Sequence, residues 1–211
     1  MSDGNFLGRR KGLLFVVSGP AGSGKGTVMK LLMQDPDSFA LSVSATTRAP
    51  GKNEVDGREY FFVSRERFEE MIAKKELLEY TDYLGNYYGT PRAPAEAVLG
   101  TGRHLLLEID VDGGRQIKAA FPEAVLVMIV PPGAAEQERR LRTRARDSEE
   151  SILRRLERAK AELTEAEHYD YVIVNETGEA EKTADVFRAI VTAEMASVRR
   201  IPDLKERYYA N

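Results

Sequence analysis

One nine-residue segment constrains this chain more than any other. Residues 19–27 read GPAGSGKGT and directly follow the apolar run Leu13–Val17. A buried strand that runs into a glycine-rich turn, a lysine and a helix forms a phosphate cradle, because the glycines let successive backbone N–H groups point at one anion. Lys25 adds a charge that can reach the outer phosphates. The segment predicts an α/β fold with a P-loop, and ATP or GTP with Mg²⁺ as its ligand.

The segment departs from the strict P-loop pattern at one position. A serine or threonine normally follows the lysine and holds Mg²⁺, but Gly26 lies there and Thr27 comes one residue later. We expect Thr27 to reach the metal after a small shift or through water. A plain turn between strand and helix is the weaker alternative, because spacing, lysine, strand and helix all agree. The predicted ATP-binding residues here are Gly19, Pro20, Ala21, Gly22, Ser23, Gly24, Lys25, Gly26 and Thr27.

Composition narrows the chemistry further. The 211 residues include no cysteine and two histidines, which excludes disulfides, thiolate metal sites and a cysteine nucleophile. The formal net charge of -3 gives no overall positive field that would favour nucleic acid or a membrane surface. The first residues, MSDGNFLGRRKG, contain no long apolar core of a secretory signal. We therefore expect a cytoplasmic protein without nucleic-acid or membrane partners, and the oligomeric state stays open.

Apolar runs alternate with amphipathic stretches along most of the chain. Such alternation is typical of a parallel sheet with right-handed helical crossovers, here a five-stranded one flanked by helices. Helices are expected at Gly26–Met33, Gly113–Ala120 and from Ser148 to about His168. The expected buried strands are Leu13–Ser18, Leu41–Ser44, His104–Ile109, Ala124–Val130 and Tyr171–Asn175.

Two stretches interrupt the alternation and suggest a division into parts. Residues 46–94 are rich in charge, glycine and aromatic side chains and read as a small mixed α/β insertion, with a helix near Arg65–Ala73. Residues 137–155 are rich in arginine and read as a helical lid. The core then comprises residues 12–45, 95–136 and 156–198, between polar termini at 1–11 and 199–211. Both interruptions leave the core near strand ends, where open α/β sheets bind ligands.

Three further motifs make a family resemblance specific. LSVSATTRAP begins at Leu41, EVDGREY at Glu54 and GNYYGTP at Gly85. At these residues the chain resembles the guanylate kinase family, whose members transfer phosphate from ATP to GMP. The resemblance spans roughly residues 12–195 and is far more specific than the P-loop alone. It implies that residues 46–94 bind GMP and leaves the use of dGMP open.

The residue types fit such an acceptor. Arginine can fork two N–H groups onto one phosphate, tyrosine hydroxyls donate without adding charge, and a carboxylate can accept from both donors on the guanine edge. Glu79 is the candidate carboxylate. By motif, the resemblance implies guanine contacts from Ser44, Glu79, Thr90 and Asp110, and phosphate contacts from Arg48, Tyr60 and Tyr88.

The chain departs from the family pattern at two of these places. An arginine commonly follows the proline of the first motif, where this chain has Gly51 and then Lys52. Lys52 can substitute as a point charge, so we expect a weaker or differently shaped phosphate clamp. A glutamine usually follows Asp110 at the position of Asp112, and the extra acid could alter metal or base contacts.

The strand at residues 104–109 leads directly into an acid. Asp110 at the carboxyl end of a strand beside a P-loop is a candidate to organise Mg²⁺ through water. Glu108 and Asp110 alternate along the chain, so we expect them to share a face of the sheet. The alternative for Asp110 is a cap on the following helix.

The arginine-rich segment suggests a cationic clamp. Arg140 and Arg144 are four residues apart and would share a helix face. Asp147 and Glu150 resemble a capping box, which would begin a second helix and bring in Arg155. A solvated face paired with nearby glutamates is the alternative. The resemblance implies that Arg140, Arg144 and Arg155 contact ATP and the transferring phosphate, and that Asn175 lies near the adenine.

Taken together, the resemblance implies a phosphotransferase that converts ATP and GMP to ADP and GDP in purine metabolism. Its implied catalytic residues are Lys25, Arg48, Arg140, Arg144 and Arg155, with Thr27 and Asp110 at the metal. One alternative is a guanylate-kinase-like module that binds proteins without catalysis, and another is a kinase for a different small acceptor. The intact GSGKGT segment argues against the first.

Overall fold

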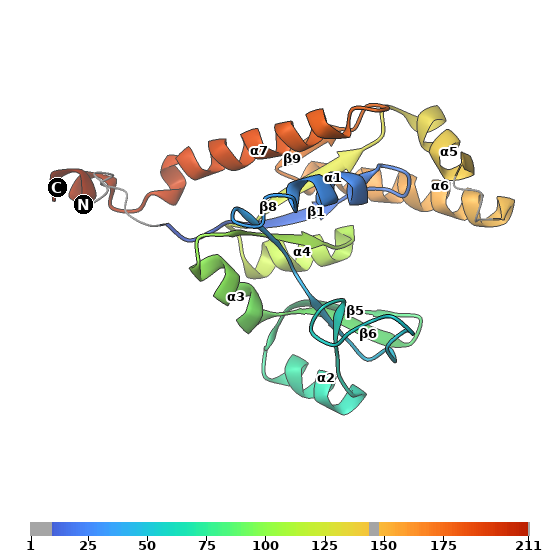
Figure 1. The fold of residues 1–211 in the computed structure, drawn as a ribbon, viewed down its shortest axis with the longest axis horizontal. Coiled ribbons are helices and arrows are strands. Elements are labelled where there is room, and N and C mark those ends of the chain that lie inside the picture. Colours follow the sequence, from blue (N-terminus) through green and yellow to red (C-terminus); the bar gives the residue numbers. More distant parts are fainter. Residues whose placement is uncertain (1–9, 144–147, 211) are drawn as a thin grey trace.

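The computed structural model describes residues 10–143 and 148–210 and contains two sheets (Figure 1). The larger sheet has five parallel strands in the order β2-β7-β1-β8-β9, with β1 at its centre. This confirms the predicted five-stranded parallel sheet. Its strands are β1 (Leu14–Ser18), β2 (Phe39–Leu41), β7 (His104–Glu108), β8 (Val125–Val130) and β9 (Tyr171–Val174).

Both faces of this sheet are buried under helices, which explains why β1 is apolar at nearly every position. Phe15 points to the face covered by α1 (Lys25–Leu32) and α7 (Ala180–Ala196), where it meets Phe187 at a ring distance of 5.1 Å. Val16 points to the opposite face, where Ile117 of α4 (Val111–Ala120) and the helix α3 (Arg92–Gly100) pack. β1 is buried along its whole length and ends at Ser18, so the P-loop begins directly where the strand leaves the core.

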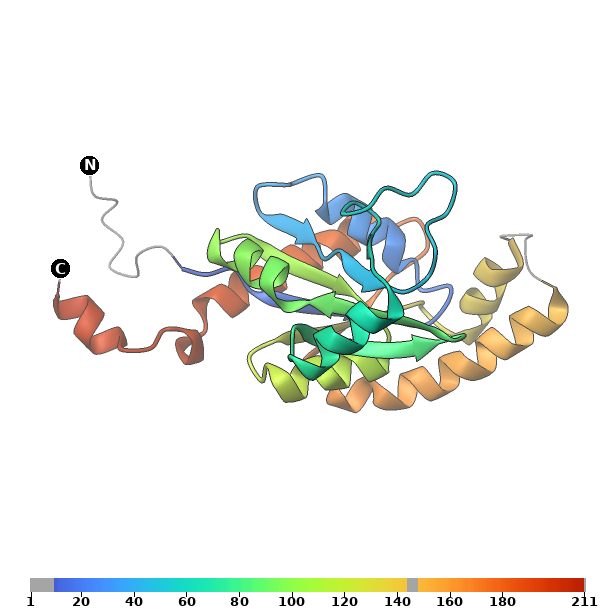
Figure 2. The same cartoon turned by 90° about the horizontal axis from the view of Figure 1, so that it is seen from below.

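The smaller sheet lies beside the core and belongs to the insertion (Figures 1 and 2). It has the order β4-β3-β6-β5, and α2 (Arg65–Ala73) packs on it through Phe68 and Met71. The helix was predicted with the same bounds. The strands are β3 (Ser44–Thr46), β4 (Tyr60–Phe62), β5 (Leu77–Tyr83) and β6 (Asn86–Pro91).

The predicted single strand at Leu41–Ser44 is wrong. The chain forms β2 up to Leu41 in the core sheet and then β3 from Ser44 in the insertion sheet. Ser42 N–H donates to the Leu106 carbonyl at 2.9 Å, which extends the core pairing by one bond, whereas Ala45 is buried in the insertion core. One apolar run therefore contributes strands to two separate sheets, and periodicity alone does not show where the chain passes from one sheet to the other.

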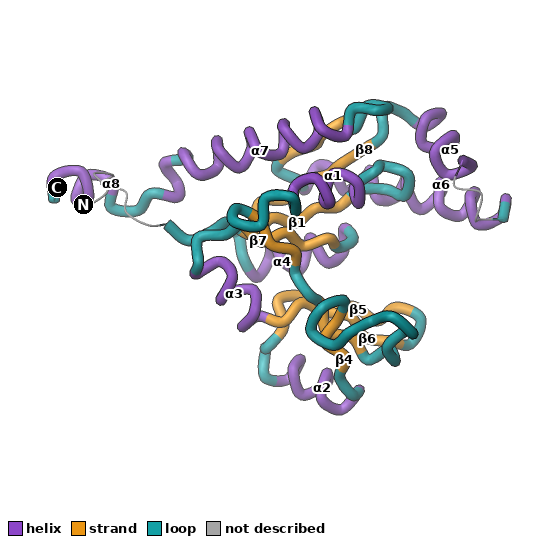
Figure 3. The backbone as a smooth tube through the Cα atoms, viewed as in Figure 1, coloured by secondary structure: helices purple, strands orange, loops and turns teal. Residues whose placement is uncertain are grey.

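The arginine-rich part forms a projecting helical hairpin at one end of the molecule, opposite the last described helix (Figures 1 and 3). It consists of α5 (Ala134–Thr143) and α6 (Glu149–Thr164), which continues into the 3₁₀ turn η1 (Glu165–His168). The predicted N-cap Asp147 lies outside the described residues, and the cap of α6 is instead Ser148, whose hydroxyl accepts from Ser151 N–H at 3.3 Å. The helix therefore starts one residue later than the proposed capping box requires.

The chain ends in a second 3₁₀ turn, η2 (Val198–Arg200), and a short helix, α8 (Leu204–Tyr209). The proposed division into parts remains a prediction, and two of its boundaries fall inside helices, at residue 94 in α3 and residue 155 in α6. Across the two described ranges, no helix is both long and apolar enough to cross a membrane.

Candidate active site

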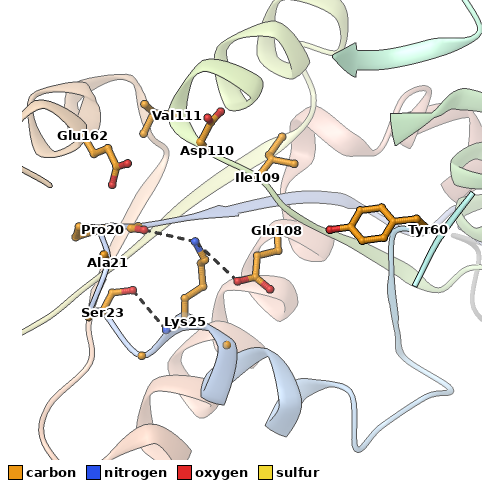
Figure 4. Close-up of a pocket in the computed structure, with 14 residues that line it drawn as sticks. Pro20, Ala21, Ser23, Lys25, Tyr60, Glu108, Ile109, Asp110, Val111 and Glu162 are labelled. Carbon is orange, nitrogen blue, oxygen red and sulfur yellow. Dashed lines mark hydrogen bonds and ion pairs between the residues drawn. The ribbon is translucent and has the colours of Figure 1, made fainter. Parts of the chain in front are cut away.

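A cavity of about 540 Å³ opens at the carboxyl end of β1, between the P-loop, the end of β7 and the insertion. Figure 4 shows Lys25 and Glu108 facing each other in this cavity, with the Tyr60 ring reaching in from the insertion. The cavity therefore joins the P-loop to the part of the chain that was predicted to hold the acceptor. It is lined by residues 19–26, Tyr60, Glu108, Ile109, Asp110, Val111 and Glu162.

Two P-loop glycines are required by the geometry of the turn. Gly24 has φ +82°, and a Cβ there would lie 2.3 Å from the side-chain nitrogen of Asn175. Gly19 has φ +152°, and its Cβ would lie 2.0 Å from the Ile129 carbonyl oxygen. An L side chain at either position would meet both backbone strain and a collision. The loop can therefore pack against β8 and Asn175 only because these residues are glycines.

Buried side-chain amides donate hydrogen bonds to carbonyl groups of the P-loop. Asn175 is 4% exposed and donates its Nδ2 to the Ser23 carbonyl at 2.7 Å. Its Oδ1 accepts from the Thr183 hydroxyl at 3.0 Å, which fixes the orientation of the amide. Gln137 of α5 donates to the Ala21 carbonyl at 2.8 Å. The sequence pointed to an adenine contact for Asn175, which remains a prediction, while its amide in this structure supports the loop.

Arg140 is part of the same support. Its Nη2 donates to the Asn175 carbonyl at 2.9 Å and its Nε to Glu136 at 2.7 Å, while Nη1 lies 3.4 Å from the carbonyls of Gly22 and Ser23. Hydrogen bonds from Arg139, Thr177 and Arg140 hold the pKa of the Glu136 carboxyl far below its usual range. Arg140 thus contacts the P-loop from α5, and its predicted contact with ATP and the transferring phosphate stays a prediction.

Of the other two predicted lid arginines, only Arg155 lies within the described residues. Arg144 lies outside the described residues. Arg155 is exposed on α6 and is not among the residues that line the cavity. The predicted contacts of both arginines with ATP stay predictions.

Lys25 is aimed into the cavity by groups on two sides. Its Nζ lies 3.4 Å from the Gly19 carbonyl oxygen and 3.9 Å from Glu108 Oε1 (Figure 4). The side chain is only partly exposed, and its amino group lies beside the loop where phosphates would bind. Glu108 was noted in the sequence only as a neighbour of Asp110, and the structure makes it the carboxylate facing the lysine.

The acids at the end of β7 do not share a pleat, because the strand ends at Glu108. Asp110 is the N-cap of α4, and its Oδ1 accepts from Gly113 N–H at 3.0 Å. The helix-cap alternative is therefore confirmed, and the expected alternation of Glu108 and Asp110 on one strand face is wrong. Both residues nevertheless line the cavity, since the turn after the strand keeps Asp110 beside it.

Two side chains of α6 that the sequence reasoning did not single out also lie at this edge. Arg158 Nη2 lies 3.4 Å from Asp110 Oδ2, and its Nε donates to Glu162 at 2.8 Å. Glu162 lines the cavity. An Arg–Glu pair four residues apart looks in the sequence like any helix surface pair, so only the path of α6 reveals that this pair reaches the core.

The residues at the cavity fit Mg²⁺ that arrives with a nucleotide. Magnesium takes oxygen ligands and is usually held by one or two carboxylates together with substrate phosphates and water. Glu108 and Asp110 supply such oxygens beside Lys25, and no group of three or more acids or histidines that could hold an ion by itself occurs among the described residues. Thr27 is exposed and does not line the cavity, so its direct metal contact stays a prediction.

The predicted base pocket is assembled from two strands of the insertion and the start of α4. Glu79 on β5 is 6% exposed and accepts from the Thr90 hydroxyl at 2.7 Å. Burial raises the pKa of the Glu79 carboxyl, and the negative charge of Asp110 adds to this shift. Gly113 of α4 packs against Glu79, since a Cβ there would lie 3.4 Å from Oε2. Glu79, Thr90 and Asp110 are thus brought together, and Ser44 lies at the start of β3.

The side chains predicted to form the phosphate clamp also lie together, with the rings of Tyr60 and Tyr88 edge to face. The Arg48 guanidinium lies 5.4 Å from the centre of the Tyr60 ring, and the rings of Tyr60 and Tyr88 are 6.0 Å apart. Tyr60 lines the cavity, so the clamp borders the P-loop side. Lys52 is exposed, and no described contact brings it to the clamp.

The two departures from the family pattern have different outcomes. Asp112 pairs with Arg115 on the outer face of α4 and does not line the cavity. At Gly51, the backbone N–H donates to Glu54 at 2.6 Å, and Arg48 pairs with the same carboxylate. The sequence reasoning did not identify Glu54, because one acid in a charged loop carries no signal of its own.

Comparisons with known proteins show to which family the chain is similar. The family model described as Guanylate kinase matches residues 11–193. The guanylate kinase of Halalkalibacterium halodurans is 47% identical over 201 residues, covering 95% of this chain and 96% of that protein. That of Carboxydothermus hydrogenoformans is 43% identical over 90% of this chain and 93% of its own length. The crystal structure of guanylate kinase from Anaplasma phagocytophilum superposes with a TM-score of 0.75 at 34% identity, covering 98% of both chains.

Proposed function

The chain belongs to the guanylate kinase family, and on that premise we propose that it transfers the γ-phosphate of ATP to GMP, forming ADP and GDP. The observation that carries the proposal is the position of Tyr60, which belongs to the Arg48 clamp and also lines the cavity of the P-loop. A phosphate on Arg48 and a triphosphate on Lys25 would therefore share one cavity. Both nucleotides are cytoplasmic metabolites, so the same proposal places the reaction there, in purine nucleotide metabolism.

On the donor side, the loop amides and Lys25 hold the β- and γ-phosphates of ATP. The transferred group carries spread negative charge and needs positioning and cations more than covalent chemistry. Lys25 is already directed into the cavity, and α1 adds the positive end of its dipole. Mg²⁺ that arrives with ATP would neutralise the phosphates, held through Glu108 and Asp110.

On the acceptor side, Glu79 selects guanine and the clamp holds the monophosphate. The ionised carboxylate accepts from the N1–H and the amino group of guanine, a donor pair that adenine does not offer on that edge. Thr90 fixes the carboxylate by its hydrogen bond of 2.7 Å. Arg48, Tyr60 and Tyr88 then orient the GMP phosphate toward the γ-phosphate of ATP.

Arg155 of α6 and Arg144, which lies outside the described residues, complete the proposal as cations at the transferring phosphate. Closure of this helical hairpin would also exclude water, which limits hydrolysis of ATP. A module that binds proteins without catalysis is less well supported, because the P-loop geometry and the lysine are intact.

One assay tests the reaction and the acceptor together. ADP formation is measured with Mg·ATP and GMP, dGMP, AMP, CMP or UMP in turn, and GMP should give by far the largest kcat/KM. Faster turnover of AMP than of GMP would overturn the acceptor assignment. Absence of turnover with every acceptor, in a protein that remains folded, would favour the binding-module alternative.

A further inference from the structure

The arginine of the acceptor clamp already holds an anion that belongs to the protein. Arg48 Nη2 lies 2.8 Å from Glu54 Oε1 and 2.9 Å from Oε2, so one amino group meets both carboxylate oxygens. The Glu54 side chain is 25% exposed and that of Arg48 33% exposed, so the pair is partly shielded from solvent. The mechanism proposed above gives no role to this carboxylate.

The position of the carboxylate resembles that of a bound phosphate. Its second oxygen accepts from the backbone N–H of Gly51 at 2.6 Å, and the Arg48 guanidinium lies over the rings of Tyr60 and Phe62. A charged fork, a main-chain N–H and nearby tyrosine hydroxyls are the donors that phosphate oxygens use. Arg48 also lies close enough to Tyr88 for that hydroxyl to help raise the arginine pKa, after the larger effect of Glu54.

The glycine at position 51 and the carboxylate fit together. A Cβ on Gly51 would lie only 3.0 Å from Glu54 Oε2, so a side chain there would crowd the carboxylate away from the backbone N–H. The turn is closed by Glu54 N–H, which donates to the Gly51 carbonyl at 3.1 Å. The departure from the family pattern at this position thus removes a cation and also makes room for an internal anion.

Charge then decides what happens when a phosphate arrives. The Arg48–Glu54 pair has no net charge, whereas the monophosphate of a nucleotide carries close to two negative charges at pH 7. A carboxylate left in place would repel that phosphate at short range and would keep the main-chain donor occupied. The favourable arrangement exchanges one anion for the other.

We propose that Glu54 is an affinity-determining residue that occupies the phosphate position of the acceptor clamp and leaves Arg48 when the phosphate of GMP binds. The inference deepens the proposed function and rests on it. It predicts that the carboxylate weakens the binding of any acceptor that carries a phosphate, and has no effect on an acceptor without one.

The test compares ligands that differ only in the phosphate. Isothermal titration calorimetry measures the Kd of GMP and of guanosine for the wild-type protein and for Glu54→Gln, which keeps the shape of the side chain and removes its charge. The Kd of GMP should fall about threefold to fivefold in the variant, the range for a partly exposed ion pair, while that of guanosine stays unchanged. An unchanged or raised Kd of GMP, or an equal gain for guanosine, would overturn the proposal.

A matched control lies five residues further along the same loop. Glu59 accepts from the Val55 N–H at 2.7 Å and from Arg58 Nε at 2.7 Å, so it makes the same two kinds of contact away from Arg48. Glu59→Gln should leave both Kd values unchanged. If it tightened GMP as much as Glu54→Gln does, the gain would come from overall charge and the proposal would fail.

A third ligand separates this inference from the proposed function. Inorganic phosphate competes for the clamp without a base, and its Kd should fall in Glu54→Gln by a similar factor. If the wild-type protein bound GMP no better than AMP, the acceptor assignment would fail while the phosphate titration still tested Glu54. If GMP turnover were confirmed and neither phosphate nor GMP bound more tightly to the variant, the role of Glu54 alone would be wrong.

Discussion

The donor and acceptor sides of the cavity are held in different ways. The P-loop is supported by buried amides and a docked arginine, with Asn175 at 2.7 Å from the Ser23 carbonyl and Arg140 fixed between Glu136 and the Asn175 carbonyl. The acceptor clamp consists of partly exposed side chains, and its arginine is paired with Glu54 at 2.8 Å. One side is built before its ligand arrives, whereas the other must first release an internal partner.

The difference follows from what each side uses to bind. Backbone N–H groups carry no counter-ion, so a loop of them can be rigid and remain ready for phosphate. Arginine carries a full charge and finds a carboxylate within reach when no ligand is present. In the proposed reaction, preorganisation would lower the cost of binding ATP, and exchange of partners would set the cost of binding GMP.

The largest effect is expected from removing the charge of Lys25, which the donor side directs at the phosphates. Lys25→Ala should lower kcat by about 10³-fold, the loss typical of one charge-stabilising group in a dry site. Steady-state ADP formation with GMP measures it, and thermal unfolding should show a fold like that of the wild type. A variant that kept most of its rate would remove Lys25 from the mechanism.

The next prediction tests whether the donor side is rigid. Gly24→Ala places a Cβ 2.3 Å from the Asn175 amide in a backbone of φ +82°, so it should destabilise the fold by about 2 kcal/mol and raise the KM for ATP. Gly26→Ala is the stability control, because a Cβ there meets nothing within 4 Å and lies in helix α1. Thermal unfolding of both variants measures the difference, and equal stability would mean that the loop yields easily.

On the acceptor side, Glu79→Gln should lower the preference for GMP over AMP in kcat/KM by about 10- to 100-fold. The amide replaces one acceptor oxygen with a donor that faces the guanine donors, and hydrogen bonds to a charged group are the stronger ones. Glu76→Gln is a matched control, because Glu76 pairs with Arg67 on the exposed side of the insertion. Unchanged discrimination in Glu79→Gln would remove that carboxylate from the base pocket.

The smallest effect is a difference in pH dependence between the two sides. Burial raises the pKa of Glu79 above 4.5, so acidification protonates it above that pH and weakens the binding of guanine. The Kd of guanosine, which has no phosphate to titrate, should rise by at most about tenfold per pH unit below that pKa, and Glu79→Gln should abolish the rise.

On the donor side the pKa shift has the opposite direction. The pKa of Glu136 is lowered, so its contribution to stability is complete above about pH 4.5 and declines only as the pH falls further. The melting temperature of the ligand-free protein should therefore change little through loss of this network at mildly acidic pH, where guanosine binding already weakens. A fall of the melting temperature in parallel with the guanosine affinity, absent in Glu136→Gln, would show that the two sides are not held differently.

Much of the site was predictable because its signals are local. The P-loop glycines and Lys25 are adjacent in the chain, so their spacing alone indicates a phosphate cradle. The acceptor residues Arg48, Tyr60, Glu79 and Tyr88 were found through motifs rather than through periodicity, and the structure brings the clamp and the base pocket to one side of the P-loop cavity.

The missed features depend on contacts between distant segments. Asn175 and Gln137 support a loop more than 100 residues away, and Arg158 reaches Asp110 only because α6 runs back along the core. The strand at Leu41–Ser44 was misread because two cores share one apolar run. Such contacts have no fixed spacing along the chain, so neither periodicity nor motif can find them.

The sequence by itself determined the P-loop, the α/β class and the family of the chain, because these rest on short segments whose chemistry depends on residue order. Only the tertiary structure decided that Arg140 contacts the P-loop and that Glu54 forms an ion pair with Arg48. Each arginine has several acidic or carbonyl groups nearby in the sequence with which it could pair. Which partner it contacts depends on distance and burial in the folded structure, once the core and the insertion have packed against each other.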